Sequence, residues 1–228
     1  MHPLDNVIWQ ALTTRQAHFA ESFQSARRFP REVSPLCGFK EPNDDGYYSL
    51  AGLVHPAASI GVFLDEEYKP RAGWDYVVGA PLLQMICENG SAALTSAKTA
   101  AQVVELGTPE SPEMLELTAL TKPGPFGART HELGLYLGIR EQGKLVAMAG
   151  ERLKVPGFTE ISAVCTHPDH LGNRYAGVLM AEVMKQIRER GETPFLHVRS
   201  DNARAIALYE RLGFRKRWEG YFAVLKKK

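Results

Sequence analysis

The sequence predicts a mixed α/β fold, and three observations support this prediction. Hydrophobic residues make up 44% of the 228 residues and charged residues 23%, which is ordinary for a folded protein and disfavours a chain that is disordered or a coiled coil throughout. The length suits one large domain or two small ones. Strand-type and helix-type segments alternate towards the C-terminus. We therefore expect a mixed sheet with a crossover connection.

The first hundred residues predict a small α/β unit. Ile8, Leu12, Phe19 and Phe23 recur near the helical period, which predicts an amphipathic helix over residues 7–26. Four short β-type runs follow, separated by clusters of Pro, Gly, Asp and Asn: residues 47–54, 60–64, 74–78 and 82–87.

A connector rich in Asn, Gly, Ser, Ala and Thr covers residues 89–102 and predicts two domains, residues 1–100 and residues 101–228. The role of the first domain is left open by its sequence. The second has the sharper pattern. Its predicted elements, in chain order, are a strand (103–106), a helix (111–120), a loop (122–127), a short helix (128–136), a hairpin (138–140 and 145–154), a strand (158–166), a helix (174–189), a strand (194–198), a helix (202–212) and a strand (214–225).

Charge and cysteine usage narrow the class of protein further. Lys and Arg number 27 against 26 Asp and Glu, so the overall balance predicts no nucleic-acid partner and no membrane partner. The chain from Lys185 to Lys228 is basic, however, and this portion could attract a small polyanion. Three distant cysteines and a start unlike a signal peptide favour a cytoplasmic protein without disulfides.

The segment from Val164 to Gly177 predicts a strand, a polar turn and a helix start. A helix N-terminus presents unpaired amides and the positive end of the helix dipole, so small residues at such a turn allow it to cradle a pyrophosphate. Gly and Asn also occur in such turns for conformational reasons alone. Downstream, Asn202 and Tyr209 lie seven residues apart, which places them on one helical face about 10 Å apart along the axis.

This turn, followed by the segment Asn202-Ala203-Arg204-Ala205-Ile206-Ala207-Leu208-Tyr209-Glu210-Arg211-Leu212-Gly213-Phe214, resembles the GNAT superfamily of coenzyme A-dependent N-acetyltransferases, in a bacterial branch with an N-terminal extension. The resemblance covers residues 103–225. It implies a GNAT-like fold, a mixed and mostly antiparallel sheet with flanking helices, preceded here by the smaller α/β domain. In such a fold the strand over 158–166 splays from the strand over 194–198, and the pantetheine arm lies in the gap.

The resemblance implies an acyltransferase that moves an acetyl group from acetyl-CoA to a primary amine of a small molecule or of a peptide or protein. The alternative is a catalytically weak or inactive module that binds coenzyme A or an acyl-CoA. Leu171 and Arg174 motivate this alternative, because the family pattern has Arg or Gln and Gly at these positions. The chain could also form a homodimer. The implied cofactor contacts are Val164, Cys165, Thr166, Gly172, Asn173, Arg174, Tyr175, Ala176, Gly177, Asn202 and Tyr209.

Three residues are candidates for catalysis. Tyr209 resembles the family tyrosine that protonates the departing thiolate, although packing beside its leucine neighbours is the alternative. Glu160 is a candidate general base, because strand alternation puts it on one face with Ser162, Val164 and Thr166. Glu151 competes for that role at the end of an apolar run. For either glutamate, a structural ion pair is the alternative.

No metal site is predicted. Cys165, His167 and His170 have a spacing that could suggest one, but alternation turns the first two side chains one way while His170 falls in the turn.

Overall fold

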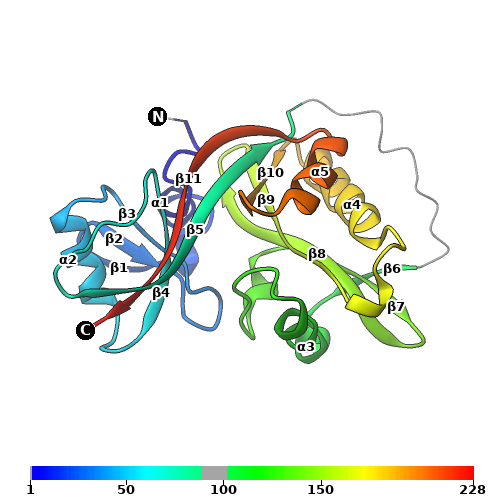
Figure 1. The fold of residues 1–228 in the computed structure, drawn as a ribbon, viewed down its shortest axis with the longest axis horizontal. Coiled ribbons are helices and arrows are strands. Elements are labelled where there is room, and N and C mark those ends of the chain that lie inside the picture. The colour runs from blue at the N-terminus through cyan, green and yellow to red at the C-terminus, as the bar shows by residue number, and fades with distance from the viewer. Residues whose placement is uncertain (1, 89–101) are drawn as a thin grey trace.

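An eight-stranded sheet organises the protein (Figure 1). The computed structural model describes residues 2–88 and 102–228. The strand order is β4-β11-β5-β10-β9-β8-β7-β6, and all neighbours are antiparallel except β9 and β10. The predicted mixed, mostly antiparallel sheet is therefore confirmed. The strands are β4 (Ser59–Leu64), β5 (Trp74–Ile86), β6 (Val103–Leu106), β7 (Tyr136–Glu141), β8 (Lys144–Val155), β9 (Phe158–Thr166), β10 (Thr193–Arg199) and β11 (Arg215–Lys227).

Helices cover both faces of this sheet. Helix α4 (Tyr175–Glu189) is the crossover between β9 and β10, and it packs with α5 (Ala203–Arg211) on one face. Helices α1 (Val7–Thr13) and α3 (Ser111–Thr121) pack on the other face. No helix in the described part of the chain is long and apolar enough to span a membrane.

Strand β5 joins the N-terminal part of the chain to the C-terminal part. It lies between β10 and β11, pairing with β10 through residues 82–86 and with β11 along its whole length. Figure 1 shows β5 and β11 as one long twisted ribbon that extends from the N-terminal elements to the C-terminal helices. The two runs predicted over 74–78 and 82–87 are thus a single strand. The sheet includes strands from both predicted domains, and the division itself stays a prediction, since most of the connector lies outside the described residues.

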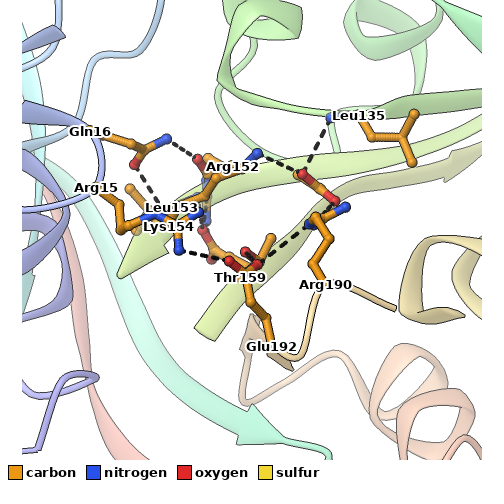
Figure 2. A network of polar contacts seen from close by, with 11 residues as sticks. Arg15, Gln16, Leu135, Arg152, Leu153, Lys154, Thr159, Arg190 and Glu192 are labelled. Atoms are coloured by element: carbon orange, nitrogen blue, oxygen red, sulfur yellow. Dashed lines mark hydrogen bonds and ion pairs between the residues drawn. The ribbon is translucent and has the colours of Figure 1, made fainter. Parts of the chain in front are cut away.

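Helix α1 ends well before residue 26, so the prediction of one helix over 7–26 is wrong. Gln16 ties the chain to β8 just after the helix (Figure 2). Its Nε2 donates to Arg152 O at 2.7 Å, and its Oε1 accepts from Lys154 N at 3.1 Å. These buried bonds redirect the backbone, because they satisfy β8 groups that would otherwise lack partners.

The chain after α1 forms a separate three-stranded antiparallel sheet of β1 (Glu21–Phe23), β2 (Ala26–Arg28) and β3 (Cys37–Phe39). The strand predicted over 47–54 is instead helix α2 (Asp44–Leu53), and that prediction is wrong. Asn43 begins the helix, because its Oδ1 accepts from Gly46 N at 2.9 Å. Two aspartates in the first turn complement the helix dipole. This cap outweighs the β propensity of the tyrosines that follow.

Candidate active site

Strands β9 and β10 form a fork. They pair only at their first residues, where Phe158, Thr159 and Glu160 lie opposite Thr193, Pro194 and Phe195. Beyond Glu160 the two strands are not paired, which confirms the predicted splay. His197 is half-buried as a residue although its side chain is only 2% exposed, so the exposed part is backbone that faces the gap. The fork therefore offers main-chain hydrogen-bonding groups to a ligand.

A β-bulge changes the faces of β9 beyond the fork point. Ser162 lies opposite Gly150 and Cys165 lies opposite Met148, so β9 contains one extra residue between these pairs. Ala163 has a left-handed backbone with φ 54° there. Cys165 consequently shares the face of Ser162 and packs beneath α3. The expectation that Val164 and Thr166 share the face of Glu160 is therefore wrong, because strict alternation ends at the bulge.

A cleft of about 1830 Å³ follows the fork. It brings together the strand, the turn and the helix that the motifs predicted. Asn173 does not line the cleft, whereas all the other predicted cofactor contacts do: Val164, Cys165, Thr166, Gly172, Arg174, Tyr175, Ala176, Gly177, Asn202 and Tyr209. Neither Glu160 nor Glu151 lines it.

The turn before α4 uses the left-handed backbone region twice. Gly172 has φ 90°, and Arg174, the N-cap residue just before α4, has φ 62°. Glycine adopts this region freely, whereas a residue with a Cβ adopts it at a cost. Arg174 thus keeps the backbone shape of the glycine that it replaces in the family pattern, and adds a guanidinium to the wall of the cleft.

The cleft is strongly basic. Among the described residues, Glu182 and Glu189 are its acidic lining residues. Eight basic residues line it: Lys122, Arg152, Arg174, Lys185, Arg188, Arg199, Arg204 and Arg211. Such a lining favours an anionic ligand, because like charges in a concave wall reinforce one another.

Helix α5 presents two of the predicted residues to the cleft. Asn202 caps the helix, since its Oδ1 accepts from Ala205 N at 3.1 Å. The rings of Tyr209 and Phe214 form a T-shaped pair with their centroids 6.2 Å apart. Burial raises the pKa of Tyr209 to about 12. The phenol therefore stays protonated at neutral pH and can donate a proton or a hydrogen bond.

Glu160 is fully buried and has four hydrogen-bond donors around it. Arg152 donates from Nε to Oε2 at 2.9 Å and from Nη2 to Oε1 at 2.7 Å. Leu153 N approaches Oε2 at 3.3 Å, and His197 Nδ1 lies 2.6 Å from Oε1. Burial would raise the pKa of Glu160, but Arg152 and then His197 outweigh burial and lower this pKa to about 2. These are the contacts of the ion-pair alternative, and the role of general base stays a prediction.

Glu151 lies in a second buried cluster. Arg190 Nη2 donates to its Oε1 at 2.5 Å, Lys154 Nζ lies 2.8 Å from its Oε2, and Leu135 N donates to Oε2 at 3.3 Å. Arg190 and Leu135 are seen in Figure 2 on the side of β8 away from Gln16. With two cations and an amide around it and no surface on the cleft, Glu151 has the environment of a structural ion pair.

Two residues of the cleft were not predicted from the sequence. Arg152 and His197 both line the cleft and both contact Glu160. Each follows an apolar run of its strand, residues 145–150 before Arg152 and residues 194–196 before His197, and this was the available signal. The described residues hold no group of three or more His, Cys, Asp and Glu side chains arranged for a metal ion.

A forked sheet with a basic cleft beside a helix start defines the fold class of GNAT acyltransferases, and comparisons place the chain in that class. The model of the FR47-like protein family matches residues 136–223. A crystal structure of a protein assigned to the GNAT family of acetyltransferases, from Novosphingobium aromaticivorans DSM 12444, is 35% identical, covers 100% of both chains and has a TM-score of 0.91. The chain belongs to the GNAT superfamily.

Two further relatives match over a shorter segment or at lower identity. Mycothiol acetyltransferase from Brachybacterium faecium is 40% identical over 85 residues, which are 35% of this chain and 25% of that protein. The match thus spans a quarter of the curated relative. A GCN5-related N-acetyltransferase from Kribbella flavida is 16% identical over 98% of this chain and 96% of its own, with a TM-score of 0.63, which shows a shared fold.

Proposed function

We propose that this protein is an acetyl-CoA-dependent N-acetyltransferase that acts on a primary amine of a small molecule or of a peptide. The observation that supports this most is the fork of β9 and β10, which opens onto a basic cleft at the start of α4. The main chain at Val164, Cys165 and Thr166 would hold the pantetheine arm. The turn amides and Arg174 beside them would hold the phosphates.

The basic C-terminal portion supports the same assignment. Five of the eight basic cleft residues lie after residue 184, within the segment expected to attract a small polyanion: Lys185, Arg188, Arg199, Arg204 and Arg211. The module that only binds an acyl-CoA is not favoured. Leu171 and Arg174 were the reason for that alternative; both line the cleft, and Arg174 retains the left-handed backbone.

Chemistry at the cleft requires a proton donor and a neutral amine. Acetyl-CoA supplies an acyl group activated as a thioester: the C–S bond breaks, a C–N bond to the amine forms, and the sulfur takes a proton. Tyr209 would donate that proton, and a backbone N–H of the fork would polarise the carbonyl. Glu160 could accept a proton only by giving up one of its four contacts. We therefore propose that the amine enters the cleft in its neutral form.

Release of free thiol from acetyl-CoA with a broad panel of amines tests the proposed function. We expect saturable thiol release above background hydrolysis, with kcat/KM rising with pH towards the pKa of each amine. Acetyl-CoA binding followed by calorimetry runs in parallel on the same preparation. Binding without thiol release from any amine would favour the binding module, and absence of binding by folded protein would contradict both.

Arg174→Gly tests two contributions of Arg174 at the turn, that of its guanidinium to affinity and that of its left-handed backbone to stability. We expect acetyl-CoA to bind about 10-fold more weakly, because a charge-assisted contact is lost. We also expect the free energy of unfolding to rise by about 1 kcal/mol, because glycine relieves the left-handed backbone. Gln142→Gly is the matched control, since Gln142 also has a left-handed φ of 51° but does not line the cleft. It should be stabilised in the same way with unchanged affinity. Unchanged affinity in Arg174→Gly would contradict the contact.

A further inference from the structure

Five neighbouring strands contribute one polar side chain each to a continuous row on the face that carries α1. The row crosses β11, β5, β10, β9 and β8 in sheet order, and its members are Arg217, Gln84, His197, Glu160 and Arg152. Arg217 Nη1 donates to Gln84 Oε1 at 2.9 Å, and Gln84 Nε2 lies 3.2 Å from His197 Nε2. We call this set the polar row.

The bonds of the polar row determine which atoms donate. Because Arg217 donates to Gln84 Oε1, the other amide atom of Gln84 is Nε2, which donates to Leu4 O at 3.2 Å and to His197 Nε2. His197 Nε2 is therefore an acceptor, and Nδ1 carries the proton donated to Glu160. His197 is thus a positioning residue that holds the Glu160 carboxylate in a single orientation.

Arg152 is the last member of the polar row, and only two of its three guanidinium nitrogens bind Glu160. Glu160 binds Nε and Nη2, which orients the planar guanidinium. Within residues 2–88 and 102–228, Arg152 Nη1 has no hydrogen-bond partner. The side chain is nine-tenths buried and lines the cleft. Nη1 is not among the polar atoms sealed from solvent without a partner. It therefore opens onto the cleft.

Arg152 lies at the closed end of the fork, because it binds Glu160, the last residue of β9 that pairs with β10. The turn that would hold the phosphates follows the end of β9, at the open end of the fork. An extended ligand held there runs towards the closed end, where Glu160 is the last paired residue of β9 and Arg152 binds it. The nearby wall is apolar, with Leu36, Phe63 and Phe222 lining the same cleft. A single oriented N–H donor in an apolar wall determines how a ligand lies.

We propose that Arg152 is the residue that determines acceptor specificity, with Nη1 donating to a carbonyl-type oxygen beside the acceptor amine. The acceptor class is then an α-amino compound, either a free amino acid or the N-terminus of a peptide, rather than a plain alkylamine. This inference rests on the proposed function. It agrees with the need for a neutral amine, since an α-amino group of a peptide has a pKa of about 8 whereas that of a lysine side chain is about 10.

Three matched acceptors test the inference: phenethylamine, phenylalaninamide and phenylalanine. They share an aromatic group for the apolar wall and differ in the oxygen beside the amine. Thiol release gives kcat/KM, calculated per concentration of neutral amine so that differences in amine pKa cancel. We expect the wild-type protein to favour one or both oxygen-bearing acceptors by about 10-fold or more, mainly through KM. A preference for the amide identifies a peptide acceptor, and a preference for the acid identifies a free amino acid.

Two variants assign that preference to Nη1. Arg152→Lys keeps a cation beside Glu160 but lacks the Nη1 arm of the guanidinium. Arg152→Met with Glu160→Leu removes both charges, so that neither is left buried alone. In each variant that folds, the preference should fall to within about 3-fold, with KM for acetyl-CoA unchanged. Retention of the preference by either variant overturns the inference.

The comparison of the three acceptors with the wild-type protein also tests the inference without any variant. Equal kcat/KM for the three acceptors overturns the role of Arg152 and leaves the N-acetyltransferase standing. Thiol release from none of these three, but from other amines of the panel, likewise overturns the inference alone. Absence of thiol release with every amine of the panel contradicts the proposed function as well.

Discussion

Tyr209→Phe is expected to lower kcat about 100-fold and to leave KM for acetyl-CoA nearly unchanged. The phenol lines the cleft, and burial raises its pKa to about 12, so it carries its proton throughout the pH range of activity. Removing a positioned proton donor slows the chemical step by a factor of this size. The measurement is steady-state thiol release with saturating acceptor.

Tyr221→Phe is the matched control for this experiment. Tyr221 is also buried, but it does not line the cleft, and its hydroxyl lies 2.9 Å from the hydroxyl of Tyr76. We expect the control to keep the wild-type kcat. If Tyr209→Phe also keeps it, the phenol is a packing element, and the proton for the departing sulfur comes from elsewhere.

Glu160→Gln is expected to lower the free energy of unfolding by about 3–5 kcal/mol, because it leaves the buried guanidinium of Arg152 without its carboxylate. Arg152 and Glu160 are both buried, and the ion pair has two bonds of 2.9 and 2.7 Å. Denaturant unfolding of the variant and of the wild-type protein measures the loss. The variant with Arg152→Met and Glu160→Leu should lose less, because no charge is left alone.

The same pair predicts a pH dependence of stability. The pKa of Glu160 is lowered in the folded protein to about 2 from an ordinary value of 4.5. A lowered carboxyl pKa stabilises the folded state above the unfolded pKa, so this contribution of about 3 kcal/mol is complete above pH 4.5 and is lost as the pH falls towards 2. Glu160→Gln should have a flatter stability curve between these pH values. A curve parallel to that of the wild-type protein would show that Glu160 is not the titrating group.

Local sequence was sufficient to predict the strand and helices that line the half of the cleft that would bind the cofactor. Strand β9 has the bounds that were predicted, and α4 begins one residue after its predicted start. The turn before α4 and the cap at Asn202 depend on residues adjacent in the chain, which is why their pattern could be interpreted without the fold. Helix α2 shows the opposite, since its cap at Asn43 was overlooked in favour of β propensity.

The sequence by itself determined the family motifs, the strand-turn-helix that opens the cleft and the residues of α5 that face it, because each of these is a short-range pattern. Only the tertiary structure decided that β5 lies between β10 and β11, that a bulge at Ala163 turns Cys165 towards α3, and that Glu160 has four donors around it. The physical reason is that strand neighbours and the partners of a buried charge come from distant parts of the chain. Their identity depends on the order of strands in the sheet, which local periodicity does not contain.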